Sequence, residues 1–298
     1  MTDFLQFVFA GSALGARYAL VALGFVVIYR ATGVINFAQG GLVALGAYIA
    51  YHFTDRIGAP FVIAVLAAVA ACAIVGVLIQ RVVLARMVGQ PAFAVIMITI
   101  GLLFVIEQLI PTLWGYNSHN LGDPWGIKTV DLAGLTLAER DLWTLAIAAM
   151  ALGGFFAFFR LSRYGLAMRA VAIDQEAALA QGISVGAVVA VSWAISGMVA
   201  ALAGVTLSTG ATAVSPTISF IALAAFPAMI LGGLDSPGGA VIGGLLIGIT
   251  QTLTAGYQPE HAAWLGDNFH VVMPYVVMIV ILMVRPYGLF GVPEVDRA

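Results

Sequence analysis

The chain has 298 residues, of which 62% are hydrophobic and 9% are charged, whereas soluble domains average about 45–50% and about 25%. So few charges cannot cover a water-exposed surface, and a net charge of −2 without a basic stripe excludes nucleic acid as a partner. The hydrophobic residues come in blocks of about 20, the length of a helix that crosses a hydrocarbon core of roughly 30 Å. We therefore predict an all-α, polytopic transmembrane helical bundle.

Apolar runs bounded by charges and turn residues predict nine spans, within a range of about eight to ten. The first run carries Asp3 in place of a basic cluster and exceeds signal-peptide length, so we expect a retained span. Two runs are weaker: one is entered through residues 33–39, and another is short and contains Pro227, so either could be broken or re-entrant. The predicted spans lie near residues 4–29, 36–54, 60–80, 91–113, 141–160, 185–207, 217–233, 239–257 and 268–285.

Basic residues predict the orientation, because short cytoplasmic loops collect Lys and Arg. Of the twelve Lys and Arg residues, Arg17 lies inside the first span, and the loops on one side hold only Arg56, Lys128 and Arg140. The loops on the other side hold the rest, so we predict an N-out, C-in topology. The residues on this inner side are Arg30, Arg81, Arg86, Arg160, Arg163, Arg169, Arg285 and Arg297.

Two loops are long enough for a role of their own. The extracytoplasmic loop, about residues 114–140, suits either contact with an outer partner or a solvated cap over the bundle. The cytoplasmic loop, about residues 161–184, is rich in alanine and free of proline, which predicts a short helix that ends at Gly182. Small residues at helical spacing on this helix suit a groove on another protein. The alternative is a helix lying on the inner leaflet, where alanines anchor poorly.

Glycines at helix-packing intervals predict close contacts between spans, since small residues four positions apart let two backbones approach. These pairs are Gly11 with Gly15, Gly239 with Gly243, and Gly244 with Gly248.

Polar groups in apolar or irregular segments are candidates for a translocation pathway, because irregular backbone at membrane depth needs cover from protein or a water-filled cavity. Each has an alternative role in helix capping or turn formation. Glu107 has either a structural or a gating role, and we expect it to pair with Arg17, since leaving either charge alone in the bilayer is costly. The candidates are Asn36, Gln39, Thr99, Glu107 and Ser215.

Several other classes of protein do not fit. Lys128 is the only lysine and follows Ile127, so no ATP-binding P-loop is present. Cys72 is the only cysteine, and the spans hold no catalytic constellation, so we assign no catalytic residue and no metal site. Glu107 is the only acidic residue deep in a clear span. A proton-driven transporter usually carries protons on a set of ionisable groups, so a single carboxylate gives this class little support.

Four segments, in order along the chain, resemble the branched-chain amino acid ABC permeases of the LivH type. The first segment comprises residues 15–24, 33–40 and 45–48, and the third and fourth are residues 229–240 and 285–291. Arg17 departs from the small or uncharged residue expected there, which leaves the solute in doubt. The second segment is the cytoplasmic loop, with matching positions at Gly165, Met168, Arg169, Ala170, Ala177, Ala178, Gly182 and Ile183.

The resemblance implies the channel-forming permease subunit of an ABC importer, a single domain over residues 1–298, in a bacterial inner membrane. It implies a second homologous permease, two cytoplasmic ABC ATPase subunits and a periplasmic solute-binding protein as partners, and no cofactor, because the partners hydrolyse ATP. The solute would be a branched-chain or other amino acid, urea, an amide or a carboxylate. The residues assigned to ATPase coupling are Gly165, Met168, Arg169, Ala170, Asp174, Glu176, Ala177, Ala178 and Gly182.

A passive solute channel or facilitator is the alternative, since its pore would look much the same. The loop at residues 161–184 discriminates between the two, because a facilitator has no reason to present it to an ATPase.

Overall fold

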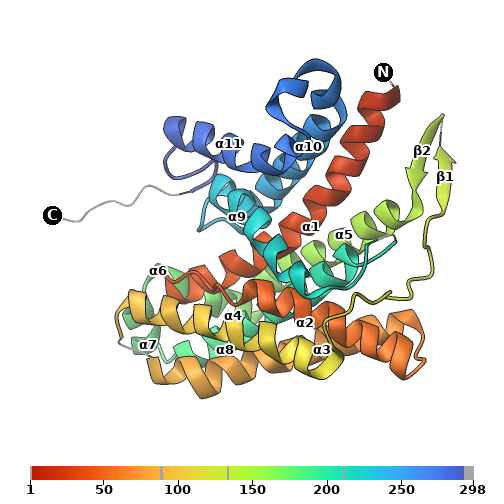
Figure 1. The fold of residues 1–298 in the computed structure, drawn as a ribbon. Coiled ribbons are helices and arrows are strands. Elements are labelled where there is room, and N and C mark those ends of the chain that lie inside the picture. Colours follow the sequence, from red (N-terminus) through yellow and green to blue (C-terminus); the bar gives the residue numbers. More distant parts are fainter. Residues whose placement is uncertain (1, 88–89, 133, 211, 292–298) are drawn as a thin grey trace.

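The computed structural model describes residues 2–87, 90–132, 134–210 and 212–291, and this part of the chain is mostly helical (Figure 1). One small antiparallel hairpin interrupts the helices, formed by β1 (Thr129–Leu132) and β2 (Leu135–Ala138) with Thr129 opposite Ala138. The helices are α1 (Thr2–Thr32), α2 (Gln39–Tyr51), η1 (His52–Arg56), α3 (Phe61–Leu78), η2 (Ile79–Val83), η3 (Leu84–Met87), α4 (Ala92–Trp114), α5 (Glu139–Leu161), α6 (Arg163–Ile173), α7 (Gln175–Ala180), α8 (Val185–Leu207), η4 (Pro216–Phe220), α9 (Ile221–Gly232), α10 (Pro237–His261), η5 (Ala263–Leu265) and α11 (Phe269–Val284).

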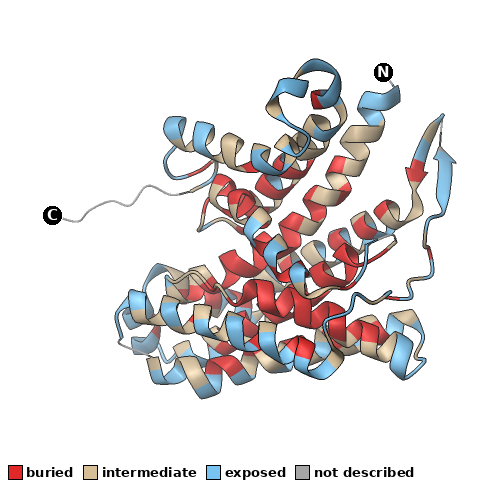
Figure 2. Cartoon of the chain, in the orientation of Figure 1, coloured by how far each residue is buried: buried red, intermediate tan, exposed pale blue. Residues whose placement is uncertain are grey.

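Helix α1 is the centre of the bundle. It packs on α10 and α9 along one side and on α8 and α5 along others, and most of its residues from Gly11 onward are buried (Figure 2). Helix α2, only 13 residues long, is buried almost throughout, because α3, α4, α8 and η4 surround it. The buried residues of Figure 2 therefore gather where α1, α2 and α8 meet.

Glycine brings the backbones of α1 and α10 into direct contact. A methyl group built on Gly15 would lie 2.6 Å from the Cα atom of Leu245, and one on Gly11 would lie 2.7 Å from that of Ile249. Gly244 packs on Ala19, so the two helices run antiparallel. In lipid, helices associate through close van der Waals packing of this kind, because the surrounding chains are as apolar as the helix surface. The predicted glycine pairs on these two helices are confirmed as packing contacts.

The loops gather at two opposite ends of the bundle. At one, which we call the α6–α7 end, α1 and α3 finish, α4 and α8 begin, and the Gln175 amide donates a hydrogen bond to the Ala31 carbonyl at 3.2 Å. At the other, the hairpin end, Thr54 Oγ1 donates to the Leu121 carbonyl at 2.7 Å, and Asp123 Oδ1 accepts from the Gly210 N–H at 3.0 Å. Figure 1 shows α6 and α7 on the left and the hairpin on the right.

In the described part of the chain, six helices are long and apolar enough to cross a membrane: α1, Phe61–Met87, α4, α5, α8 and α10. They correspond to six of the predicted spans. The remaining three predicted spans, 36–54, 217–233 and 268–285, form shorter helices. The first begins only at Gln39, because residues 33–38 form a loop, and it ends in the π-helix η1. Nine spans therefore remain a prediction.

The loop at residues 161–184 differs from its prediction of one helix, because it contains two, α6 and α7. Ser162 caps α6, and Asp174 Oδ1 accepts a hydrogen bond from the Ala177 N–H at 2.9 Å, which starts α7 as a separate helix. Gly182 follows α7 in the left-handed region, with φ +81°, as a glycine cap requires.

We expect Gly15→Ala to lower the free energy of unfolding by about 1–3 kcal/mol, because its new methyl group would push α1 away from α10. Gly101→Ala is the matched control, since a methyl group at this exposed position on α4 meets nothing within 4 Å. The measurement is unfolding of the purified chain in mixed micelles, followed by circular dichroism. Equal stability of the two variants would contradict the close α1–α10 contact.

Candidate translocation cavity and coupling loop

A cavity of about 530 Å³ opens at the α6–α7 end. Its mouth is formed by exposed residues, among them Gly33, Gln90, Gln175 and Gly186, and its floor by buried polar ones. The volume falls within the roughly 300–1,000 Å³ typical of ligand pockets. The lining residues come from the end of α1, the α1–α2 connection, η2 and η3, α7, and the starts of α4 and α8.

Two predicted pathway residues, Asn36 and Thr99, meet on the cavity floor. Asn36 Oδ1 accepts a hydrogen bond from the Ala38 N–H at 3.0 Å. Thr99 Oγ1 accepts from the Phe37 N–H at 3.2 Å and donates to the Ile96 carbonyl at 2.9 Å. These bonds satisfy backbone N–H groups of the loop between α1 and α2. The loop therefore keeps its irregular conformation and does not extend helix α1.

The floor also contains unpaired hydrogen-bond donors. Asn36 and Trp193 are each about 1% exposed, and within the described part of the chain Asn36 Nδ2 and Trp193 Nε1 have no partner. Among the described residues, four other buried atoms, which belong to Arg17, Tyr48, Trp125 and Arg140, also lack a hydrogen-bond partner and do not line the cavity, although Arg140 Nε lies 3.8 Å from Asp141 Oδ1. An unpaired buried donor costs about 1–3 kcal/mol.

Gln39 lies next to this floor, inside the protein. Its Oε1 accepts from Ser196 Oγ at 2.6 Å, which links α2 to α8. The side chain lies against Gly24 of α1, where a methyl group would collide with it. Gln39 therefore joins three helices and does not line the cavity.

The other two candidates lie farther toward the hairpin end. Glu107 is eight positions after Thr99 on α4, and its Oε1 accepts from Ser219 Oγ at 2.5 Å. Ser215 pairs with Thr217 across 2.7 Å in the segment that leads into α9. Gly40, near the start of α2, packs on the Ser219 backbone. The predicted pathway residues therefore follow one another past the start of α2 and do not form one cluster.

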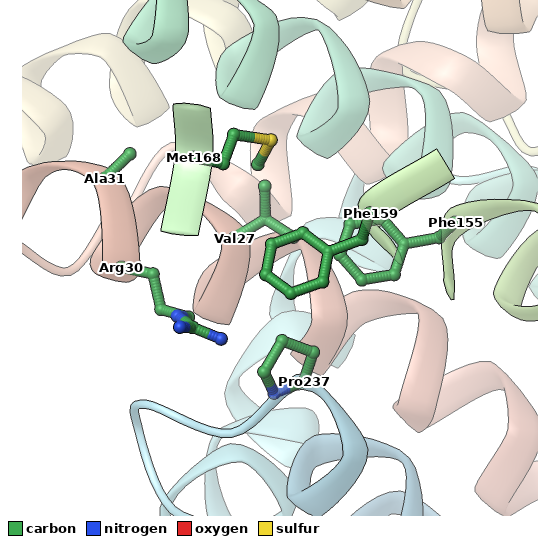
Figure 3. Close-up of a pocket in the computed structure, with 7 residues that line it drawn as sticks. All are labelled: Val27, Arg30, Ala31, Phe155, Phe159, Met168 and Pro237. Atoms are coloured by element: carbon green, nitrogen blue, oxygen red, sulfur yellow. The ribbon is translucent and has the colours of Figure 1, made fainter. Parts of the chain in front are cut away.

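The predicted coupling loop, residues 161–184, is attached to α1 and α5 by side chains that face the bundle. Arg169 donates a hydrogen bond to the Phe159 carbonyl, and its guanidinium and that of Arg30 lie 5.4 and 5.3 Å from the centre of the Phe159 ring. Figure 3 shows Arg30, Phe159 and Met168 around this junction. The space between them is about 10 Å³, room for at most one water molecule, so the junction is packed.

The predicted coupling residues divide by burial. Gly165, Met168 and Ala178 are buried, and Arg169 and Ala170 are half-buried, so these five hold the loop to the bundle. Asp174, Glu176, Ala177 and Gly182 are exposed and free to meet another protein.

Polar residues that line the cavity but were not predicted from the sequence include Gln80, Gln90, Gln175 and Trp193. Gln175 is the most informative, because it belongs to the coupling loop and also bonds to Ala31. The sequence signal that could have identified Gln175 is its position directly after Asp174, which caps helix α7.

Comparison with known proteins shows the family of the chain. A family model described as "Branched-chain amino acid transport system / permease component" matches residues 7–282. The chain belongs to this permease family.

Relatives are similar along almost their whole length. The high-affinity branched-chain amino acid permease LivH of Escherichia coli is 30% identical, over 99% of this chain and 97% of that protein. BraD of Pseudomonas aeruginosa is also 30% identical, over 99% and 98%. A chain of PsaBC from Streptococcus pneumoniae, solved with a Fab, is 16% identical with a TM-score of 0.48 over 93% of this permease and 90% of that chain, which is too distant to support an argument.

Arg17 of this permease has a different partner from the one predicted. Its Nη2 lies 3.1 Å from Asp141 Oδ1 and 3.2 Å from Thr144 Oγ1, both on α5, and the two charged side chains are only 14% and 12% exposed. The expected pairing with Glu107 is wrong, because α5 lies against α1 whereas Glu107 bonds to Ser219. Removing one member of such a pair leaves a buried charge without compensation.

We predict that Arg17→Ala and Asp141→Ala will be non-additive, with a coupling energy of about 1–3 kcal/mol, because each single change already breaks the same ion pair. Unfolding of the single and double variants in mixed micelles measures this energy. Arg17→Ala combined with Glu107→Gln is the control pair and should be additive. Additive effects for Arg17 and Asp141 would show that the ion pair contributes nothing.

Proposed function

We propose that this chain is the channel-forming permease subunit of an ATP-binding-cassette importer in a bacterial inner membrane. Its solute is a branched-chain or other amino acid, or a related small polar molecule such as urea, an amide or a carboxylate. The observation that carries the proposal is the family match over residues 7–282, which includes the whole coupling loop. The chain supplies no ATPase site or cofactor of its own, and partner subunits hydrolyse ATP.

The partners in this proposal follow from the division of labour in such importers. A second homologous permease completes the pathway, two ATPases bind the exposed side of α6 and α7, and a periplasmic binding protein delivers solute to the hairpin end. The binding protein supplies selectivity, so the permease needs few polar groups along its path.

Charge supports an orientation with the α6–α7 end in the cytoplasm. Seven basic residues predicted to be inside belong to segments at this end: Arg30, Arg81, Arg86, Arg160, Arg163, Arg169 and Arg285. The eighth, Arg297, lies outside the described residues. The hairpin end holds Arg56, Lys128 and Arg140. Because cytoplasmic loops collect basic residues, this asymmetry favours N-out, C-in.

The contacts suggest how ATPase movement would reach the pathway. Closure of the ATPases would displace α6 and α7, which hold the end of α1 through Phe159 and through the Gln175–Ala31 hydrogen bond. The same end of α1 continues into the loop that forms the cavity floor. Since α1 and α10 touch through backbone, they would move together, and the cavity would open to one side of the membrane at a time.

A passive facilitator remains the second candidate, and purification tests both. The tagged chain is purified from its native membrane, its partners are identified by mass spectrometry, and the ATPase activity of the eluate is measured. Recovery of two ATPases and a second permease supports the importer. A chain that purifies alone and without ATPase activity would favour the facilitator.

We expect Ile173→Asp to abolish co-purification of the ATPases, because Ile173 is 85% exposed at the end of α6 and offers an apolar contact. Ile127→Asp is the matched control at the hairpin end, where Ile127 is 87% exposed. Both variants should unfold at the wild-type temperature. Loss of ATPases in the Ile127 variant alone would reverse the proposed orientation. Charge reversal at Arg169 should also weaken docking, but it additionally breaks the contact with Phe159.

A further inference from the structure

The outward sides of α3 and α5 have the composition that lipid requires. The exposed residues of α3, Leu66 among them, are all apolar, and so are those of α5 from Ala146 to Ala157. A helix surface in contact with hydrocarbon meets no partner for a polar side chain. These two helices therefore provide the comparison for the outward side of α4.

Helix α4 carries a polar group on its outward side. Gln108 is exposed and lies six residues before the end of the helix at Trp114, which places it about 9 Å inside that end. The nearby Thr112 Oγ1 donates to the Gln108 carbonyl at 2.7 Å, so its hydroxyl group is satisfied. In the described part of the chain the side-chain amide of Gln108 has no hydrogen bond. Hydrocarbon would leave this amide unpaired, which is strongly unfavourable.

Gly101 lies two turns before Gln108 on the same side of α4. Together with Val105 and Thr112 these residues recur at helical spacing, and all four are exposed; we call them the α4 face. A methyl group built on Gly101 meets nothing within 4 Å, so a neighbouring helix has room to approach. Membrane helices associate through both features, a small residue that permits close approach and an amide that hydrogen-bonds across the contact.

The rest of α4 connects this face with the predicted pathway. Thr99 lines the cavity floor, and Glu107 accepts a hydrogen bond from Ser219 of η4. A pathway that is completed by a second subunit must adjoin the residues that line it in the first, and the α4 face is the exposed surface of the helix that carries them. A Gln amide has both donor and acceptor groups, so the corresponding face of a related subunit can pair with it.

We propose that the α4 face is the contact surface for a second permease subunit, and that the Gln108 amide hydrogen-bonds across this contact. The identity of the partner rests on the proposed function, in which a second permease completes the pathway, whereas the surface itself is argued from Gln108. Thr99 and Glu107 then lie beside the boundary between the two subunits. The outward side of α5 stays in lipid.

Photo-crosslinking in the intact complex identifies what covers the α4 face. Phe104 lies one turn before Gln108 and is 60% exposed, so Phe104→p-benzoylphenylalanine adds only a benzoyl group and leaves Gln108 in place. Leu66→p-benzoylphenylalanine is the matched control, at a residue of α3 that is 62% exposed. After irradiation of the native membrane, we expect mass spectrometry to find a covalent adduct with a permease subunit at Phe104 and only lipid adducts at Leu66.

Substitutions on the face test the contact by co-purification in detergent. Gln108→Leu should lower the amount of second permease that is retained by roughly threefold to thirtyfold, the range for one hydrogen bond between membrane helices. Thr112→Val is its control, because this hydroxyl group bonds within α4. Gly101→Leu should also release the second permease, because it fills the space for the neighbouring helix. Gly153→Leu, at an equally open and exposed glycine of α5, should not.

Several outcomes would overturn the proposal. Adducts at Phe104 with lipid alone, with an ATPase or with a solute-binding protein would each do so. Release of the second permease by Gly153→Leu and not by Gly101→Leu would move the contact to α5. Recovery of two ATPases and a second permease, with only lipid adducts at Phe104, would remove this contact and leave the importer intact. An adduct with a second copy of the chain, in a sample without ATPases, would keep the contact and remove the importer.

Discussion

The backbone contact between α1 and α10 is the constraint on which the rest of the permease depends. Water drives apolar side chains together in a soluble protein, but lipid gives no such force between helices. Close approach through Gly15 and its neighbours replaces that force with van der Waals contact. Once α1 is held in this way, its other faces are presented to α5, α8 and the coupling loop.

Along α1, each further contact uses a different kind of interaction. Near the hairpin end, Arg17 is neutralised by Asp141. Midway, Gly24 leaves room for Gln39, whose amide ties α2 to α8. At the α6–α7 end, Arg30 lies on Phe159 and the Ala31 carbonyl accepts from Gln175. A single helix thus connects the loops at both ends of the bundle.

Sequence patterns were sufficient for the features that depend on composition and local spacing. Hydropathy located the long helices, and glycine spacing predicted which positions pack closely, although not which helices they pack against. Pairings between distant segments could not be predicted, because hydropathy does not say which helices are neighbours: Arg17 and Asp141 are 124 positions apart. Trp193 was missed because a tryptophan inside an apolar run is typical of a packed core. The separate helix α7 had a readable signal in the cap Asp174, which the alanine content obscured.

Helix α7, which belongs to the 161–184 loop, and the end of α1 both line the cavity, and the Gln175 amide joins them by donating to the Ala31 carbonyl. If ATPase binding shifts α7, it alters the site beside Gln175, and a solute in that site must alter the affinity for the ATPase by the same factor. This reciprocity holds for binding energies whatever the direction of the movement. Two contacts join the 161–184 loop to the end of α1: the Gln175–Ala31 hydrogen bond, and the Phe159 ring that both Arg30 and Arg169 contact.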